Sequence, residues 1–394
     1  MPLLTYKDAR PWAKSMKEAV LLRRMPPWFA DEAHGEFSND RRLSKGEVGT
    51  LVAWVDGGAK EGDPKDAPGP LSFENGWSIP KPDAVVEMPQ AFEVPASGVV
   101  EYTYFVVPTG FTEDKWVEQV EMRPGDRSVV HHAVMLVRHP GSHYVEEAKP
   151  GIPYVPPKRS ERRQPDDGRG ELSFSSGDTE MLCVYVPGGG PNQLKPGQAR
   201  LIPKGSDLIF EMHYTTNGKP VSDRSRVGFI FAKQPPRERV VNTYVQNHNL
   251  RIPPEVADYP VTARVMLYEQ TRMLSLFPHM HVRGKSFEYR VRYPTGKTEI
   301  LLSVPKYDFN WQMAYYLQRP KVLPKGTVIE CVAHYDNSPN NPSNPDPTTE
   351  VLWGDQTWDE MLAGFMDLAM PVTTRLHDVA FRKTPAIEIP PDIR

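Results

Sequence analysis

The hydrophobic residues near the start of the chain recur at helical spacing. They predict an amphipathic helix whose apolar face is formed by Trp12, Met16, Ala19 and Val20. A second helix is predicted to begin at Ser44, because Glu47 stands three residues later and completes a capping box, and to end at Gly57. We therefore expect a helical segment over residues 1–62, followed over residues 63–82 by a linker rich in Gly, Pro and Asp.

From about residue 83 onward, apolar and polar residues alternate with a period of two. The clearest case is the stretch from Phe287 to Tyr293, in which aromatic residues and Val alternate with charged ones, as in a half-buried strand. A turn sequence follows at Pro294–Lys297, and Thr298–Val304 is predicted to pair back as the next strand. Further strands are predicted at Leu208–Tyr214 and Val328–Tyr335.

Short strands joined by turns, without helical runs between them, are typical of β-sandwiches. We predict a mainly β protein with two antiparallel, jelly-roll-like sandwich domains at residues 83–235 and 236–375, and a tail at 376–394. The polar stretch 139–200 is predicted to be a long excursion from the first sandwich. The 42 prolines among 394 residues agree with this class, because proline interrupts helices and central strands.

Composition and charge exclude several classes of protein. The 47 basic and 50 acidic residues leave a net charge of −3, so no charge imbalance steers the chain toward nucleic acid or an anionic membrane. No apolar run approaches the ~18–20 residues of a membrane span. Two cysteines, Cys183 and Cys331, are too few for a disulfide scaffold or a Cys-rich zinc site, and the sequence leaves open whether they pair. No signal peptide is recognised, which fits a cytoplasmic protein or a mature or trimmed form.

Two histidine patterns stand in the predicted first sandwich. His131 and His132 are adjacent, and neighbouring residues on a regular strand point to opposite faces. Both could reach one metal ion only at a strand end, a bulge or a sharp turn. His213 lies on a predicted strand, on the face opposite Phe210, Met212 and Tyr214. Taken singly, each pattern is more often structural than metal-binding.

The second predicted sandwich carries a different set of candidate ligands. His279 and His281 are two residues apart, so on a strand they point the same way, with their backbones ~6.5–7 Å apart. Met361 follows Glu360 near the end of the domain. Methionine is ordinarily core filler, but its thioether is a soft ligand that favours Cu(I). Two histidines and a methionine would leave a coordination position open for dioxygen, whereas three imidazoles suit a copper ion that only cycles electrons.

Taken together and in order, these patterns resemble the copper type II, ascorbate-dependent monooxygenases, the family of dopamine β-hydroxylase and peptidylglycine α-hydroxylating monooxygenase. The resemblance covers residues 85 to 370, and the separations also look like those of the family. His132 and His213 are 81 positions apart, His213 and His279 are 66 apart, and His281 and Met361 are 80 apart.

The resemblance implies a particular division of roles. One copper ion, which transfers electrons, would be held in the first sandwich by His131, His132 and His213. A second, catalytic copper ion would be held in the second sandwich by His279, His281 and Met361. In the family, ascorbate reduces both ions, dioxygen binds at the catalytic copper, and a C–H bond of the substrate is hydroxylated.

Three positions depart from the peptide-amidating members of the family. Those members carry Arg two residues before the His-x-His sequence and Asn and Tyr after the Met, and these residues clamp a substrate carboxylate. The corresponding residues of this chain are Phe277, Ala363 and Phe365. We therefore expect a small apolar or aromatic substrate near these side chains rather than a peptide ending in glycine; tight, productive hydroxylation of such a peptide would refute this expectation.

The N-terminal segment and the low cysteine count bear on the electron donor and the location of the protein. Met25-Pro26-Pro27-Trp28 and the helix after it resemble the C-terminal part of a cytochrome c domain, but the Cys-x-x-Cys-His sequence that attaches haem is absent. We expect a helical cap, and a haem or cytochrome electron donor in a longer protein remains a hypothesis. The family's animal members are rich in disulfides, so this chain resembles a bacterial relative, for which we expect a periplasmic or secreted location.

Two alternatives stay open at the level of the sequence. The chain could be an inactive or single-metal twin β-sandwich binding protein of the same fold, or a zinc or iron enzyme that uses a subset of these histidines. Five further histidines are interpreted as surface or structural residues: His139, His143, His248, His334 and His377.

Overall fold

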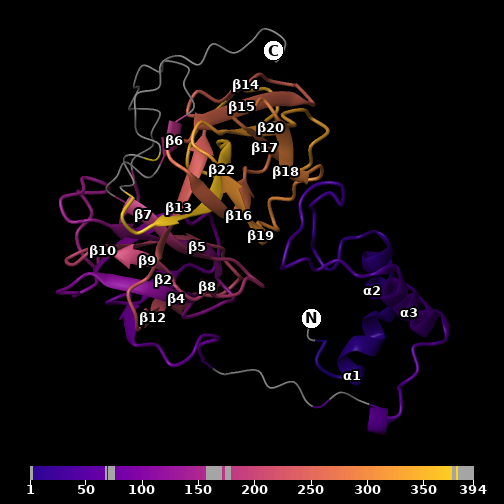
Figure 1. The fold of residues 1–394 in the computed structure, drawn as a ribbon. Helices are drawn as coiled ribbons and strands as arrows, with labels where there is room; N and C mark the ends of the chain where they lie inside the picture. The colour runs from indigo at the N-terminus through magenta and orange to yellow at the C-terminus, as the bar shows by residue number, and fades with distance from the viewer. Residues whose placement is uncertain are drawn as a thin grey trace.

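The computed structural model describes residues 3–66, 69, 76–156, 171–173, 179–374 and 379. Mainly β structure, in several mostly antiparallel sheets, follows a short helical N-terminal segment (Figure 1), so the predicted fold class is confirmed. The helical elements are α1 (Tyr6–Ala9), η1 (Arg10–Trp12), α2 (Ala13–Leu21), α3 (Lys45–Asp56) and η2 (Pro64–Asp66). Apart from residue 379, the tail predicted at 376–394 lies outside the described residues.

The first sandwich consists of two sheets packed face to face. One is the four-stranded sheet β3-β10-β5-β7, and the other begins with strands β1-β12-β4-β9. Their bounds are β1 (Ala84–Glu87), β3 (Thr103–Pro108), β4 (Lys115–Arg123), β5 (Val130–Arg138), β7 (Thr179–Tyr185), β9 (Gln198–Ile202), β10 (Asp207–Tyr214) and β12 (Arg226–Phe231). Apolar side chains between the two sheets, among them Phe105, Phe210 and Phe229, form the core.

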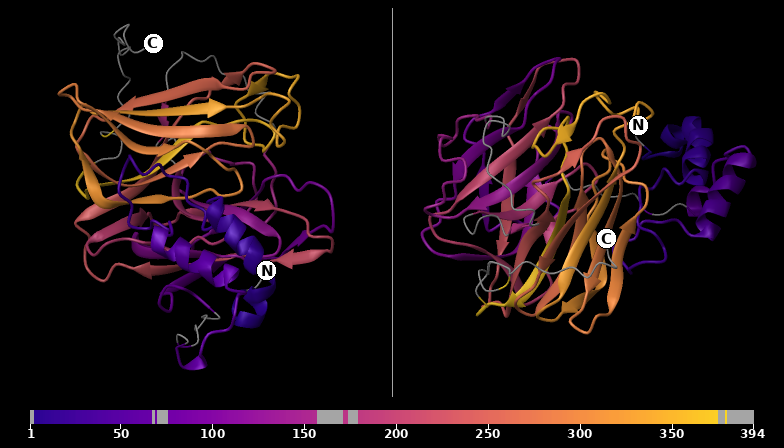
Figure 2. Two further views of the ribbon diagram at one scale, coloured as in Figure 1. Left: turned by 90° about the vertical axis from the view of Figure 1, so that its right-hand side faces the viewer. Right: turned by 90° about the horizontal axis from the view of Figure 1, so that it is seen from above.

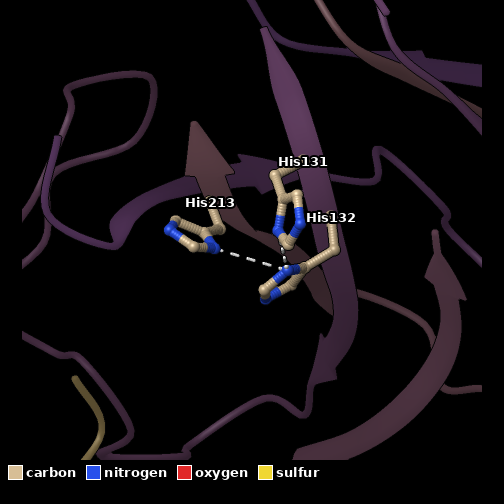
Figure 3. Close-up of side chains that lie close together, drawn as sticks. All are labelled: His131, His132 and His213. Atoms are coloured by element: carbon tan, nitrogen blue, oxygen red, sulfur yellow. Dashed lines mark hydrogen bonds between the residues drawn. The ribbon is translucent and has the colours of Figure 1, made fainter. Parts of the chain in front are cut away.

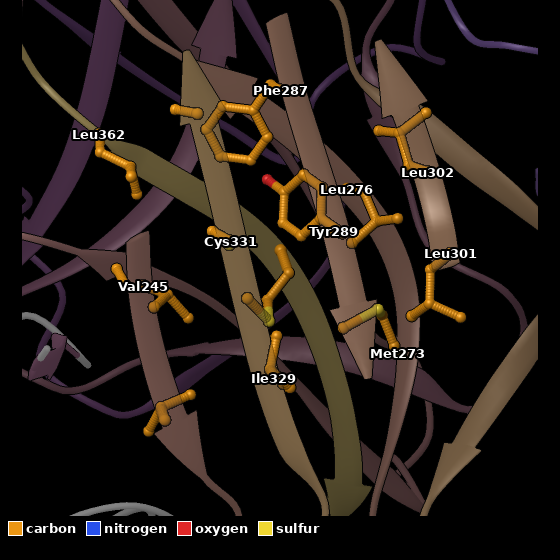
Figure 4. Close-up of a cluster of buried hydrophobic side chains, with 14 of the residues drawn as sticks. Val245, Met273, Leu276, Phe287, Tyr289, Leu301, Leu302, Ile329, Cys331 and Leu362 are labelled. Carbon is orange, nitrogen blue, oxygen red and sulfur yellow. The ribbon is translucent and has the colours of Figure 1, made fainter. Parts of the chain in front are cut away.

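The second sandwich pairs strands β13-β22-β16-β19 with the four-stranded sheet β15-β20-β17-β18. The bounds are β13 (Glu238–Gln246), β15 (Tyr259–Met266), β16 (Thr271–His279), β17 (Gly284–Arg292), β18 (Thr298–Val304), β19 (Tyr315–Leu323), β20 (Val328–Tyr335) and β22 (Ala363–Pro371). Leu276, Phe287 and Tyr289 lie in its core with Cys331 (Figure 4). Cys183 and Cys331 are both buried free thiols.

A single sheet joins the two sandwiches. Strand β9 of the first sandwich pairs in parallel with β13 of the second through Gln198–Glu238 and Ala199–Arg239, so the order β1-β12-β4-β9-β13-β22-β16-β19 is continuous. Short strands add to it: β6 (Glu171–Ser173) pairs with β13, and β8 (Asn192–Gln193) pairs with β4. Small two-stranded sheets are formed by β2 (Phe92–Val94) with β11 (Val221–Asp223) and by β14 (Arg251–Ile252) with β21 (Val351–Leu352).

The N-terminal helices lie beside the sandwiches, whereas the segment between α2 and α3 packs against the second sandwich (Figures 1 and 2). Trp28 and Phe37 are buried there, with ring centroids 4.9 and 5.4 Å from that of Tyr315. Met25, the residue at the position of a haem ligand in the cytochrome-like pattern, has 45 % of its surface exposed. Within the described residues, none of the helices has the length and apolar character needed to cross a membrane.

Candidate metal centre

A β-bulge brings the adjacent histidines of the first sandwich to the same side. Strands β5 and β10 pair antiparallel with His213 opposite His132, but the next pair joins Tyr214 to Val130. His131 is therefore the extra residue of the bulge, and the regular alternation of side chains is interrupted at that point. A bulge is one of the irregularities that allow the adjacent His131 and His132 to face one metal ion.

The three imidazoles of His131, His132 and His213 converge (Figure 3). The Nδ1 atom of His132 lies 3.1 Å from Nδ1 of His131 and 3.4 Å from Nδ1 of His213. Two nitrogens that each lie about 2.0–2.1 Å from one metal ion, at roughly tetrahedral angles, are separated by about 3.1–3.5 Å. The spacing of these nitrogens therefore fits a single ion.

Burial keeps these imidazoles in the neutral form that binds metals. It lowers the pKa of His131 and His132, and it lowers the pKa of His213 to about 4, with neighbouring imidazoles adding to the effect at His132 and His213. A neutral imidazole keeps a lone pair for a metal ion, whereas a protonated one does not.

Tyr102 orients two of the three histidines. Its ring stacks on His213, with centroids 4.6 Å apart and an interplanar angle of 18°, and its hydroxyl lies 3.0 Å from Nε2 of His132. Because the hydroxyl is hydrogen-bonded to Nε2, Nδ1 is the nitrogen of His132 that can bind a metal ion together with the other two histidines. Nothing in the sequence marks Tyr102, because it stands 30 positions before His132 and is brought to it by strand pairing.

We expect Tyr102→Phe to weaken metal binding at the first cluster by roughly 10–100-fold, the usual effect of removing an outer hydrogen-bond partner of a ligand. Isothermal titration with Cu(II) would measure this, with Tyr293→Phe as control. Tyr293 bonds Glu299 in the second sandwich and contacts none of the three histidines. Equal affinities in the two variants would contradict an orienting role for Tyr102.

The histidine pair of the second sandwich is held by hydrogen bonds at its Nδ1 atoms. His279 is the last residue of β16, and its ring centroid lies 5.2 Å from that of His281. Nδ1 of His279 donates to Oε1 of Gln312 at 2.7 Å, and Nδ1 of His281 donates to the carbonyl oxygen of Asp359 at 3.1 Å. Because both Nδ1 atoms carry the proton, both Nε2 lone pairs remain available to a metal ion.

These two imidazoles are also neutral. Burial lowers the pKa of His279, and burial together with the neighbouring His279 lowers the pKa of His281 to about 3.

A buried carboxylate joins the His279–His281 turn to the strand end that carries Met361. Glu360 is fully buried, and its side chain accepts backbone N–H groups of His281 at 2.8 Å, Arg283 at 2.7 Å and Met361 at 3.2 Å. The hydroxyl of Tyr335 donates to the carbonyl oxygen of Met361 at 2.7 Å. Burial raises the pKa of Glu360 to about 8, while the three N–H groups favour its ionised form. The structure therefore fixes the backbone of Met361 beside that of His281.

The three residues expected near the substrate, Phe277, Ala363 and Phe365, lie beside His279 in strands β16 and β22. Phe277 is the cross-strand partner of Phe365, with ring centroids 5.9 Å apart, and His279 is the partner of Ala363. The ring of Phe365 also contacts that of His279 at 6.1 Å. This surface beside the histidine is apolar, as the sequence indicates at these positions.

The two histidine sets approach each other across one side chain, Phe309. Its ring centroid lies 6.4 Å from that of His131 and 6.2 Å from that of His281. The two sets also interact electrostatically, because His279 and His281 both lower the pKa of the buried His132. A cavity of about 150 Å³ beside them is lined by both sandwiches, including His131, His132, Phe277 and Gln312.

The other histidines within the described residues lie elsewhere. His334, on β20, bonds the carboxylate of Asp258 at 2.8 Å, and His143 bonds Glu146 at 2.6 Å. His248 contacts the ring of Trp353. His377 lies outside the described residues.

Comparison with known proteins adds little to this geometry. No family model matches the chain, and no curated protein matches it. Among solved structures, the chain is similar to the major capsid protein P2 of bacteriophage PM2, at 9 % identity and a TM-score of 0.31, over 74 % of this chain and 98 % of that one. An infectious bursal disease virus VP2 subviral particle matches at 9 % identity and a TM-score of 0.21, over 75 % and 74 % of the two chains. These scores are too low to carry an argument about function.

Proposed function

We propose that the chain is a copper-dependent monooxygenase that hydroxylates a C–H bond of a small organic substrate. Its co-substrates would be O₂ and ascorbate or another one-electron donor. The observation that carries the proposal is that each sandwich contributes a set of buried, neutral imidazoles and that both sets contact Phe309. Such an arrangement suits a reaction that draws one electron from each of two metal ions.

The types of donor atom at both places suit copper. Imidazole nitrogens bind copper well, and those of His131, His132 and His213 already have the spacing of ligands to one ion. The second set would pair His279 and His281 with the thioether of Met361, a soft ligand that favours Cu(I). Zinc sites are built from thiolate, imidazole and carboxylate ligands, so a thioether favours copper over zinc.

When bound, the two copper ions would supply the electrons and activate dioxygen. The protein's own residues do the positioning. Gln312 and Asp359 hold the proton on Nδ1 of His279 and His281, and Glu360 holds the backbone of the ligand-bearing segments. Phe309 contacts the ring of His281, and Phe277 and Phe365 form an apolar pair beside His279.

We expect the purified chain to bind two copper ions and to consume oxygen when ascorbate is supplied. Metal content by mass spectrometry and oxygen uptake with an oxygen electrode, with and without candidate substrates, would test this. One copper ion per chain without oxygen uptake would favour the single-metal binding protein. A chain that binds no copper, or that takes up zinc or iron in preference, would overturn the proposal.

A further inference from the structure

A row of polar side chains crosses the sheet that joins the sandwiches. The register places Asn242 on β13 opposite Asp367 on β22, Asp367 opposite Ser275 on β16, and Ser275 opposite Tyr316 on β19. Arg200 on β9 extends the row, because its Nη2 donates to Oδ1 of Asp367 at 2.8 Å. All five side chains line the cavity between the sandwiches.

Several polar atoms of residues that line this cavity lack a protein partner. The side chain of Arg200 is 3 % exposed, yet only Nη2 is bonded; Nε and Nη1 have no acceptor among the residues that the structure describes. Two further atoms are buried without a partner among the described residues: Nε2 of Gln312 and Oδ1 of Asn242. Buried polar groups in native proteins are normally hydrogen-bonded, so three unused donors around one cavity indicate a ligand with acceptor oxygens.

The charges of the lining favour a single negative charge on that ligand. Arg41 and Arg200 contribute two positive charges, and Asp367 contributes one negative charge. A monoanion would therefore balance the charge, and a guanidinium matches the geometry of a carboxylate.

The row next to the polar one is aromatic and leads to the second histidine set. Phe277 and Phe365 are cross-strand partners that lie two residues along their strands from Ser275 and Asp367. His279 lies two residues beyond Phe277. Side chains two residues apart on a strand share a face, so the sheet presents a polar anchor, then an apolar surface, then His279. Phe277, Phe309 and Trp311 line the cavity on this side, as does Gln312, which bonds His279.

We propose that this cavity binds a small organic acid, with its carboxylate at Arg200 and its apolar or aromatic body along Phe277 and Phe309. That this acid is the molecule hydroxylated rests on the proposed function, whereas its binding does not. The inference refines the expected apolar substrate by adding a single anionic group, which is held by the first sandwich rather than at the positions next to His279 and Met361.

Calorimetric titration of the metal-free protein would test the site with two acids, benzoate and phenylacetate, and with their neutral amides. We expect at least one acid to bind more than about 10-fold more tightly than its amide, since a charged pair in a partly dry site contributes at least that factor. In Arg200→Gln the preference for the acid should be lost. Asp367→Asn leaves the guanidinium without its counter-charge and should bind the acid more tightly than the unchanged protein.

Arg239→Gln is the matched control. Arg239 is also a mostly buried arginine paired with a carboxylate, Glu180, at 2.7 Å, and its Nε is likewise unpartnered among the described residues, but it does not line the cavity. It should keep the preference for the acid. Absence of binding by both acids, equal binding of acids and amides, or equal losses in the two arginine variants would overturn the inference. Because no metal is present, the result is independent of whether the protein binds copper.

Discussion

Replacing His213 with alanine is expected to lower the copper content of the chain from two ions to one. His213 supplies one of the three nitrogens that converge in the first sandwich, and it lies between Tyr102, on which it stacks, and His132. Loss of the outer hydrogen-bond partner of a ligand already costs roughly 10–100-fold in metal affinity, so loss of the ligand itself should exceed about 100-fold. Mass spectrometry of the copper-loaded variant measures the stoichiometry directly.

The remaining ion in His213→Ala should be the one held in the second sandwich. Met361→Ala should give the reverse pattern, with the His131, His132 and His213 cluster still loaded. His334→Ala is the control, because His334 bonds Asp258 on the surface of the second sandwich and is outside both sets. If His213→Ala and His334→Ala kept the same copper content, the division into two independent sites would be wrong.

Glu360→Ala is expected to combine a large loss of stability with loss of the second copper ion. The substitution leaves the backbone N–H groups of His281, Arg283 and Met361 without their acceptor in a fully buried place. Each such group costs about 1–3 kcal/mol, so a decrease of at least ~3 kcal/mol in the free energy of unfolding is expected. Urea denaturation of the metal-free protein and copper titration would measure the two effects separately.

Glu360→Gln separates the loss of stability from the loss of copper, because glutamine keeps one acceptor oxygen and nearly the same side-chain shape as glutamate. We expect a smaller loss of stability but still weaker copper binding at the second set. Glu121→Gln is the matched control, because Glu121 is also buried and accepts backbone N–H groups, of Ser78 at 2.6 Å and Ile79 at 3.1 Å. It lies in the first sandwich, and its third partner is Arg123 rather than a histidine. A similar loss of copper in both glutamine variants would contradict a positioning role for Glu360.

The metal-site hypothesis could be drawn from the sequence only in part. The His-x-His spacing predicts that His279 and His281 lie close together, since residues two apart on a strand share a face. The structure keeps them close, although β16 ends at His279 and His281 lies just beyond it. The adjacent pair His131 and His132 does not, because a regular strand would separate the two side chains. The bulge that brings them together forms where β5 meets β10, and that register depends on residues some 80 positions away.

The residues that orient the candidate ligands could not be recognised from the sequence around them. Gln312 and Glu360 are brought to the histidines from 33 and 79 positions away, and Tyr102 from 30 positions before His132. A glutamine or glutamate is usually a surface residue, and only burial and contact reveal another role. The same holds for Arg200 and Asp367, which are 167 positions apart and meet where two sandwiches share one sheet.

By itself, the sequence determined the class of the fold and the candidate ligands. Alternation with period two and frequent proline turns are local properties, and they are sufficient to predict antiparallel sandwiches. The tertiary structure alone decided that one continuous sheet joins the sandwiches, that two histidine sets meet at Phe309, and that a charged cavity lies beside them. The physical reason is that burial, strand register and charge pairing depend on contacts between distant segments, which a local pattern does not contain.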